Sequence, residues 1–219
     1  MPLAGGEAEG QAMEKGDFGP AMPVEEALKL LSDGNWRFRS GMPMGLNRTA
    51  MRRDEVAAGQ KPFAAVVGCS DSRVPPELIF DVGLGDLFVV RAAGNVLDEA
   101  GLGSLEYAAE HLGVGLIVVL GHSDCGAVKA AMARTPSDGH LAGLLKSIAT
   151  FVPGWSTGMD DPVGMITKAH VGQMVLKVRQ CEPVLSRLCA EGALTVRGAI
   201  YDLQTGAVTF LQEPEMETF

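Results

Sequence analysis

Two short stretches of this sequence carry side chains that can bind a metal ion. Cys69-Ser70-Asp71-Ser72-Arg73 places a thiol two residues before a carboxylate, and His122-Ser123-Asp124-Cys125 places an imidazole three residues before a second thiol. Two thiolates and one imidazole suit Zn²⁺, and three protein ligands leave a fourth tetrahedral position for water or substrate, as in catalytic zinc sites. The sequence therefore predicts a metal centre formed by Cys69, His122 and Cys125.

The spacing of Asp71 and Arg73 predicts a second part of the same site. Two residues apart after a strand, a guanidinium fork can meet a carboxylate, and this pairing keeps Asp71 ionised and fixes its direction. The carboxylate could then accept a hydrogen bond from a water molecule on the metal. Alternatively, Asp71 turns and binds the metal itself, which closes the site. Asp71 and Arg73 are thus candidate catalytic residues, with a plain structural ion pair as the competing interpretation.

Both stretches directly follow apolar runs that are typical of buried strands. Four such runs occur, at residues 63–67, 87–90, 116–120 and 194–201. Their apolar residues are continuous rather than alternating, which indicates strands covered on both faces and hence a parallel sheet. Helical patterns lie between them, at residues 102–112 and 171–178. Alternating strands and helices indicate an α/β fold.

We expect a mainly parallel four-stranded sheet with an antiparallel edge strand at residues 207–211 and helices on both faces. If the second strand lies on one side of the first and the third on the other, the chain order reverses between them, and ligands bind at such reversals in open α/β sheets. Cys69, His122 and Cys125 would then converge at the carboxyl ends of the first and third strands.

Three further helices are expected outside this core. The first follows Pro23 and stops at residues 33–35, where Asp-Gly-Asn is a natural terminator. A second, short helix covers residues 53–58. A third begins near Gly126 and places Cys125 at its N-terminus, where free backbone N–H groups favour a thiolate.

Composition limits the remaining functions. The chain has 219 residues, a net charge of −9 and 5% aromatic residues, which argues against a nucleic-acid partner. The longest aliphatic run, residues 116–120, is far too short to span a membrane, and the acidic first 22 residues lack a signal core. We therefore expect a cytoplasmic protein with reduced thiols. The expected organisation is a flexible N-terminal arm (1–22), a single catalytic domain (23–213) and a C-terminal tail (214–219).

On these motifs, the chain closely resembles the β-class carbonic anhydrases over most of residues 24–211. The resemblance is densest at residues 69–73, 85–91, 93–95, 104–108 and 121–127. It implies that Cys69, His122 and Cys125 bind one Zn²⁺ per subunit and that Asp71 and Arg73 form a catalytic dyad.

The activity implied by the resemblance is reversible hydration of carbon dioxide to bicarbonate and a proton by a zinc-bound hydroxide. The resemblance also implies a homodimer or a dimer of dimers, with the N-terminal helix packed on the partner. Two positions depart from the family pattern. Val82 stands where related bacterial members often carry a Gln that helps to hold substrate oxygen. Val66 stands where members with a second bicarbonate site carry Trp, so we expect no such site.

Other interpretations remain beside this one. A carbonyl sulfide or carbon disulfide hydrolase would use the same fold and zinc site, and a catalytically weak zinc-binding homologue would keep the metal alone. A thiol phosphatase is excluded, because only three residues separate Cys69 from Arg73 where its anion loop needs five. We expect Asp124 to cap the helix that follows it. Core or half-exposed positions are expected for two thiols, Cys181 and Cys189, and surface positions for three imidazoles, His111, His140 and His170.

Overall fold

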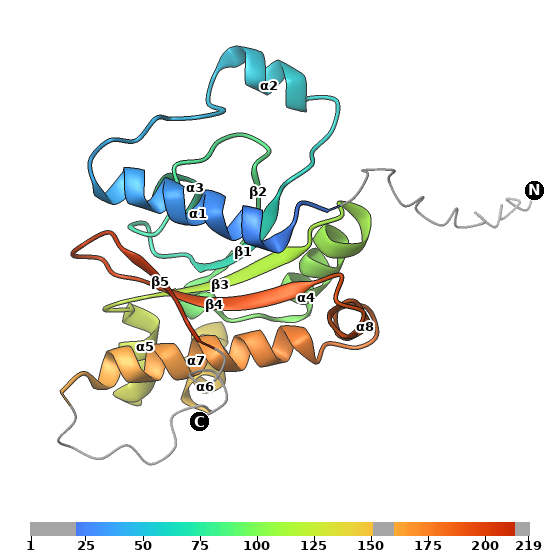
Figure 1. Cartoon of the computed structure of the whole chain (residues 1–219). Coiled ribbons are helices and arrows are strands. Elements are labelled where there is room, and N and C mark those ends of the chain that lie inside the picture. The colour runs from blue at the N-terminus through green and yellow to red at the C-terminus, as the bar shows by residue number, and fades with distance from the viewer. Residues whose placement is uncertain (1–20, 151–159, 213–219) are drawn as a thin grey trace, which may run out of the picture.

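A computed structural model describes residues 21–150 and 160–212. The predicted arm over residues 1–22 therefore lies almost wholly outside the described residues, and the tail over residues 214–219 lies entirely outside them. Five strands form one sheet in the order β2-β1-β3-β4-β5 (Figure 1). Their bounds are β1 Ala64–Cys69, β2 Leu87–Ala92, β3 Leu116–His122, β4 Thr195–Tyr201 and β5 Val208–Phe210.

The sheet has the predicted topology. β1 pairs in parallel with both β2 and β3, β3 pairs in parallel with β4, and β5 pairs with β4 in the antiparallel direction. The chain order reverses at β1, because β2 extends the sheet on one side and β3 on the other. Every residue of β1 and β3 is buried, which explains their continuous apolar sequences, whereas the edge strand β2 is only partly covered.

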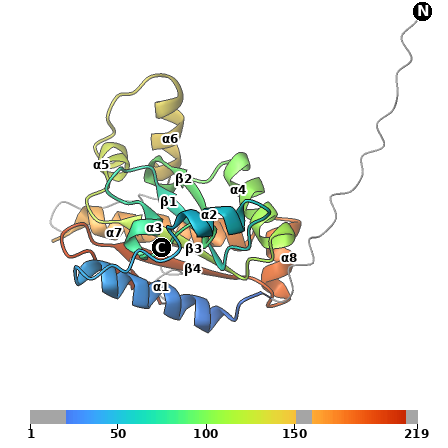
Figure 2. The same ribbon diagram turned by 90° about the horizontal axis from the view of Figure 1, so that it is seen from above.

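Helices cover both faces of this sheet (Figures 1 and 2). On one face, alternate residues of β1 and β3 pack against α1 and α3; on the other, the intervening residues pack against α4, α7 and α8. A third apolar cluster joins α5, α6 and α7 around the two site cysteines. The helices are α1 Val24–Arg39, α2 Ala50–Val56, α3 Pro76–Ile79, α4 Glu99–Glu106, α5 Gly126–Met132, α6 Gly139–Ala149, α7 Pro162–Arg179 and α8 Val184–Ala190.

The expected end of the first helix is wrong. α1 continues through Gly34 and Asn35 to Arg39, because both residues are buried and used for packing. A Cβ at Gly34 would overlap the carbonyl oxygen of Phe80, so only glycine lets the helix lie this close to the end of α3. Asn35 donates to the carbonyl of Gly206 at 2.8 Å and accepts from the N–H of Val208 at 2.9 Å. Asn35, a residue type that often ends helices, here joins α1 to the β4–β5 hairpin through these two hydrogen bonds.

Several boundaries also differ from the expected ones. α2 begins at Ala50 rather than at residue 53, because Thr49 caps it by accepting from the N–H of Arg52 at 3.1 Å. α6 was not expected from the sequence, and α4 continues into a π-helical turn at Tyr107–His111. β1 and β3 each extend far enough to include a candidate ligand. Among the described helices, none has the length and apolarity to cross a membrane.

Candidate metal centre

The three predicted ligands come together at the carboxyl edge of the sheet. Cys69 is the last residue of β1, His122 is the last residue of β3, and Cys125 precedes the first turn of α5. All three are buried, and one ligand atom from each lies within 4.8 Å of the other two. Tetrahedral Zn²⁺ with usual bond lengths holds its ligand atoms about 3.5–3.8 Å apart. A small contraction of this cluster therefore suffices to enclose such an ion.

His122 presents one nitrogen to the cluster in the way a ligand does. Its Nδ1 lies 2.9 Å from the carbonyl oxygen of Ser123, and since a carbonyl only accepts, Nδ1 carries the proton. In the neutral ring Nε2 is then the lone-pair nitrogen, and it is buried with no nitrogen or oxygen of the described residues hydrogen-bonded to it. A buried polar atom without a partner is uncommon, and an imidazole oriented through its other nitrogen is the usual state of a metal-bound histidine. The imidazole therefore fits a metal ligand.

The two thiols share one negative charge. Cys125 donates a hydrogen bond to Cys69 and, with smaller contributions from His122 and from backbone N–H groups, lowers the pKa of Cys69 to about 4. The same bond and burial raise the pKa of Cys125. Burial opposes the protonated form of His122, but the neighbouring Cys69 thiolate outweighs burial and raises its pKa. A divalent cation would allow both thiols to ionise.

Asp71 and Arg73 form the predicted pair. Arg73 Nε donates to Asp71 Oδ1 at 2.9 Å and Arg73 Nη2 donates to Oδ2 at 2.7 Å, while the N–H of Arg73 also donates to Oδ1 at 2.9 Å. The guanidinium holds the pKa of Asp71 well below its ordinary value. Asp71 Oδ2 lies 3.9 Å from Nε2 of His122. The carboxylate thus borders the cluster while both of its oxygens are engaged by Arg73.

Sequence reasoning missed Arg91, which holds the loop between Cys69 and Asp71. From β2, its Nε donates to the carbonyl of Cys69 at 2.9 Å and its Nη2 donates to the carbonyl of Asp71 at 2.7 Å. The available signal was a single charged residue within an otherwise apolar strand. Arg91 fixes the backbone on which both the first ligand and the carboxylate stand.

Two of the sequence expectations near the site are wrong. Asp124 does not cap α5; its carboxylate pairs with Lys129, and its backbone has a positive φ of 58°. His170 is not a surface residue, because it is 0% exposed and lies on α7, where its Nε2 is 2.8 Å from the carbonyl oxygen of Gly94. Its sequence position between Ala169 and Val171 on a buried helical face is the signal that could have placed it correctly. His140 is exposed, as expected.

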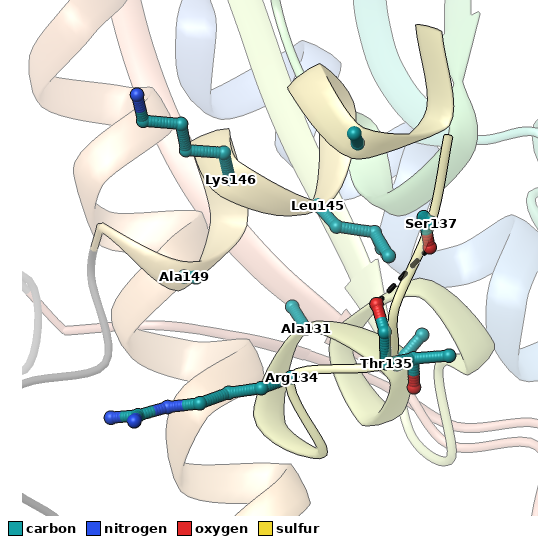
Figure 3. A pocket seen from close by; sticks show the side chains of 9 residues that line it. Ala131, Arg134, Thr135, Ser137, Leu145, Lys146 and Ala149 are labelled. Atoms are coloured by element: carbon teal, nitrogen blue, oxygen red, sulfur yellow. Dashed lines mark hydrogen bonds between the residues drawn. The ribbon is translucent and has the colours of Figure 1, made fainter. Parts of the chain in front are cut away.

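Two hollows lie near α5. One of about 500 Å³ opens beside the site and is lined by Arg73, Ser123, Asp124 and residues that include Asp161 and Asp202. The other, of about 220 Å³, lies between α5 and α6, with Ala131, Leu145, Thr135 and Ser137 along its walls (Figure 3). None of the three candidate ligands lines this second hollow. No candidate ligand lines the first hollow either, but its wall includes Arg73 of the Asp71 pair and Ser123 and Asp124, which stand between two ligands in the sequence, so it is the hollow that borders the site.

Comparisons with known proteins agree on one family. The family described as "Carbonic anhydrase" matches residues 64–208. Carbonic anhydrase 2 of Mycobacterium tuberculosis is 43% identical over 185 residues, which cover 82% of this chain and 89% of that protein. The carbonic anhydrase of Mycolicibacterium smegmatis is 40% identical over 187 residues, covering 83% and 90%.

Solved structures give the same picture. The chain is similar to tetrameric β-carbonic anhydrases of the ascomycete Sordaria macrospora, with a TM-score of 0.69, 26% identity and coverage of 86% of this chain and 98% of that one. It is also similar to a Coccomyxa β-carbonic anhydrase solved with acetazolamide, with a TM-score of 0.67, 28% identity and coverage of 86% and 85%.

Proposed function

The chain belongs to the carbonic anhydrase family, and from this premise we propose that it catalyses the zinc-dependent, reversible hydration of carbon dioxide to bicarbonate and a proton. The observation that carries the proposal is the buried cluster of Cys69, His122 and Cys125 beside an ionised Asp71. A closed structural zinc site would need a fourth protein ligand, and Asp71, the nearest candidate, is engaged by Arg73 through both oxygens.

Cys69, His122 and Cys125 would hold one Zn²⁺ per subunit. Two features of the chain fit the ion: the buried Nε2 of His122, and two adjacent buried thiols that shift each other's pKa values in opposite directions and that a cation would let ionise together. When bound, the ion supplies a Lewis acid that brings the pKa of a water molecule to about 7.

Asp71 would orient the attacking water. Because its pKa is depressed by Arg73, Asp71 is a carboxylate at neutral pH and only accepts hydrogen bonds. Accepting the water's hydrogen turns an oxygen lone pair toward carbon dioxide, and the guanidinium fork prevents the carboxylate from rotating into the water's place. Carbon dioxide is uncharged, so a small apolar space beside the water is enough to receive it. Val82, where related members often carry Gln, is 6% exposed and packs in the apolar cluster that includes residues of α1 and α3.

We also propose that the working unit is a homodimer or a dimer of dimers. Large apolar side chains are exposed on α1 and on the segment that follows it, among them Trp36 at 52%, Met44 at 66% and Met51 at 71%. Exposed apolar side chains of this size are available to an interaction surface, and the Sordaria relatives are tetrameric. Sedimentation at micromolar concentration tests this assembly, and a monomer would contradict it.

The function is tested by removing one ligand at a time. Cys69→Ala, His122→Ala and Cys125→Ala should each abolish carbon dioxide hydration in stopped-flow assays and lower the zinc content. Cys189→Ala is the matched control, because this half-buried thiol lies on α8 and belongs to no candidate ligand set among the described residues. Stoichiometric zinc with full activity in any ligand variant would refute the assignment.

The same preparation separates the alternative functions. If the wild-type protein hydrolyses carbonyl sulfide or carbon disulfide but does not hydrate carbon dioxide, the protein is a hydrolase of those substrates and not a carbonic anhydrase. Stoichiometric zinc with no turnover of any of these substrates between about pH 6 and 9, around a bound-water pKa near 7, would identify a zinc-binding homologue without activity.

A further inference from the structure

His170 is a buried polar side chain that the proposed reaction does not use. It stands on α7 and is 0% exposed, while most of its buried neighbours on that helix are apolar. Its Nε2 lies 2.8 Å from the carbonyl oxygen of Gly94. Because a carbonyl only accepts, Nε2 carries the hydrogen, and because burial lowers the pKa of His170, the ring is neutral at pH 7. A single tautomer therefore donates to Gly94.

The other backbone group of Gly94 reaches a candidate ligand. Its N–H donates to Sγ of Cys69 at 3.2 Å, a shorter contact than the 3.4 Å from the N–H of Asp71. The N–H and the carbonyl of Gly94 belong to adjacent peptide planes that meet at its Cα. Holding the carbonyl from α7 thus restricts the directions in which the N–H can point.

The conformation and surroundings of Gly94 leave only its backbone to be held. It has φ 63° and ψ 25°, the left-handed region that favours glycine. A Cβ here would lie 2.7 Å from Cδ1 of Ile148 and 3.1 Å from Cβ of Ala127, so no side chain is available to anchor the turn. Only the backbone of Gly94 can be held, and the described structure shows His170 holding its carbonyl.

A hydrogen bond to a thiolate changes what the thiolate offers a metal. Hydrogen bonds to ligand sulfur tune metal centres, and partners outside the ligand set usually alter metal affinity or activity by 10–100-fold. Two thiolates donate much charge to one divalent ion, so an N–H aimed at one of them withdraws part of that charge.

We propose that His170 is a positioning residue: it fixes Gly94 so that the Gly94 N–H points at the sulfur of Cys69 and sets the charge which that thiolate gives to the metal. The proposal deepens the proposed function and rests on the metal centre assigned there. It predicts that the donor on residue 170 matters, and not merely the volume that its side chain fills.

A matched pair of variants separates donor from volume. His170→Gln keeps an N–H donor of similar reach, while His170→Met has nearly the same length and shape without one. Val175→Ala, at another 0% exposed position of α7, controls for a general loss of packing. The probe is Co²⁺ in place of zinc, because thiolate-to-cobalt charge transfer is visible in the near-ultraviolet spectrum and reports on sulfur directly.

Of the three variants, only His170→Met should change the charge-transfer band. Without the donor, the sulfur lone pair rises in energy, so the charge-transfer band should move to longer wavelength, and zinc affinity should change about tenfold, the low end of the range for such partners. His170→Gln and Val175→Ala should keep the wild-type band. A wild-type band in His170→Met, or equal shifts in all three variants, would overturn the proposal.

The test also stands if His170→Met does not fold. In wild type loaded with ¹¹³Cd²⁺, a Gly94 N–H bonded to ligand sulfur should show scalar coupling between its amide and the metal, and absence of that coupling would overturn the proposal. A wild type that shows no thiolate–cobalt band at all would instead overturn the metal centre, and with it the proposed function.

Discussion

Asp71 and Asp81 each pair with an arginine, and the two pairs lie in different surroundings. Asp71 pairs with Arg73, two residues away, beside the ligand cluster. Asp81 pairs with Arg37, 44 residues away, through Nε at 2.6 Å, and it also accepts from the N–H groups of Met44 at 2.9 Å and Gly45 at 3.0 Å. The side chain of Asp81 is 0% exposed and that of Asp71 is 18% exposed, and their arginines are 19% and 52% exposed, respectively.

The difference shows how the sequence separation of an ion pair decides whether the pair contributes to the stability of the fold. Asp81 joins the end of α1, the segment that follows it and the turn after α3, so its loss would free three parts of the fold at once. Asp71 joins only its own loop, so its pairing adds little to the fold and is available to direct a carboxylate. We therefore expect a change at Asp81 to alter stability and a change at the Asp71 pair to alter chemistry.

The largest effect is expected from Asp81→Asn. Asparagine tolerates the positive φ of 45° at this position, so the change removes charge without straining the backbone. It leaves the partly buried Arg37 without its counterion, and breaking a buried pair in this way costs about 3–5 kcal/mol. Urea unfolding measures the loss, and Asp71→Asn is the matched variant, with a midpoint close to wild type. Equal losses in both variants would break the comparison.

The next effect is the converse one, in Arg73→Ala. Without the guanidinium, Asp71 is free to turn and occupy the fourth position on the metal. Carbon dioxide hydration near pH 7 should fall by about a hundredfold or more, the scale of a lost catalytic group, and should recover partly as rising pH lets hydroxide compete for the ion. Stopped-flow rates from about pH 6 to 9 measure this, with unchanged urea midpoint.

Asp71→Ala provides the control for that profile. It cannot close the site, so activity should be reduced at every pH, zinc should be retained, and the recovery at high pH should be missing. Full activity of Arg73→Ala at neutral pH would show that this pair, like that of Asp81, is structural.

A smaller effect is expected in acid. Burial opposes the charge on Asp81, but Arg37 and two backbone N–H groups outweigh burial and lower its pKa. The unfolded chain, with an Asp pKa near 3.9, therefore takes up this proton first. The stability that the ionised group contributes is complete above about pH 4 and is lost as pH falls through the lower folded value.

This loss changes the slope of stability against pH by at most about 1.4 kcal/mol per pH unit for one group. Zinc-free wild type should thus lose stability more steeply than zinc-free Asp81→Asn below pH 4. The site ligands are the same in both proteins and cancel in the difference. Parallel curves would mean that Asp81 does not titrate with a lowered pKa.

The smallest effect is expected at a third pair, Lys29 with Asp33 on α1. Their side chains are 73% and 51% exposed, and they lie four residues apart on the helix surface. Such pairs contribute about 0.3–0.5 kcal/mol. Lys29→Ala should therefore leave both the urea midpoint and the hydration rate close to wild type, and a large change in either would show that α1 does more than cover the sheet.

Sequence alone predicted the sheet and the ligand cluster, for a physical reason. The continuous apolar runs of β1 and β3 are the signature of strands buried on both faces, and the ligands stand directly after them, so topology brings Cys69 and His122 together. The pairing of Asp71 and Arg73 was equally predictable, because two residues on one short loop can hardly avoid each other.

What sequence did not predict depends on contacts between distant segments. Gly34 and Asn35 have the local chemistry of a helix end, and only the approach of Phe80 and Gly206 keeps them in α1. His170 and Arg91 likewise act through the backbone of loops 76 and about 20 residues away. Local sequence propensity cannot predict such contacts, because the partners are distant in the sequence.

The division of the ligand set between two strands has a consequence for how the protein matures. His122 and Cys125 are three residues apart on one turn, but Cys69, which is 53 residues before His122 in the sequence, joins them only when β1 and β3 have paired. Long-range parallel pairing is a slow event in folding. Metal capture at full affinity must then follow assembly of the sheet, so the nascent polypeptide relies on its apolar interior, and not on the ion, to reach its native topology.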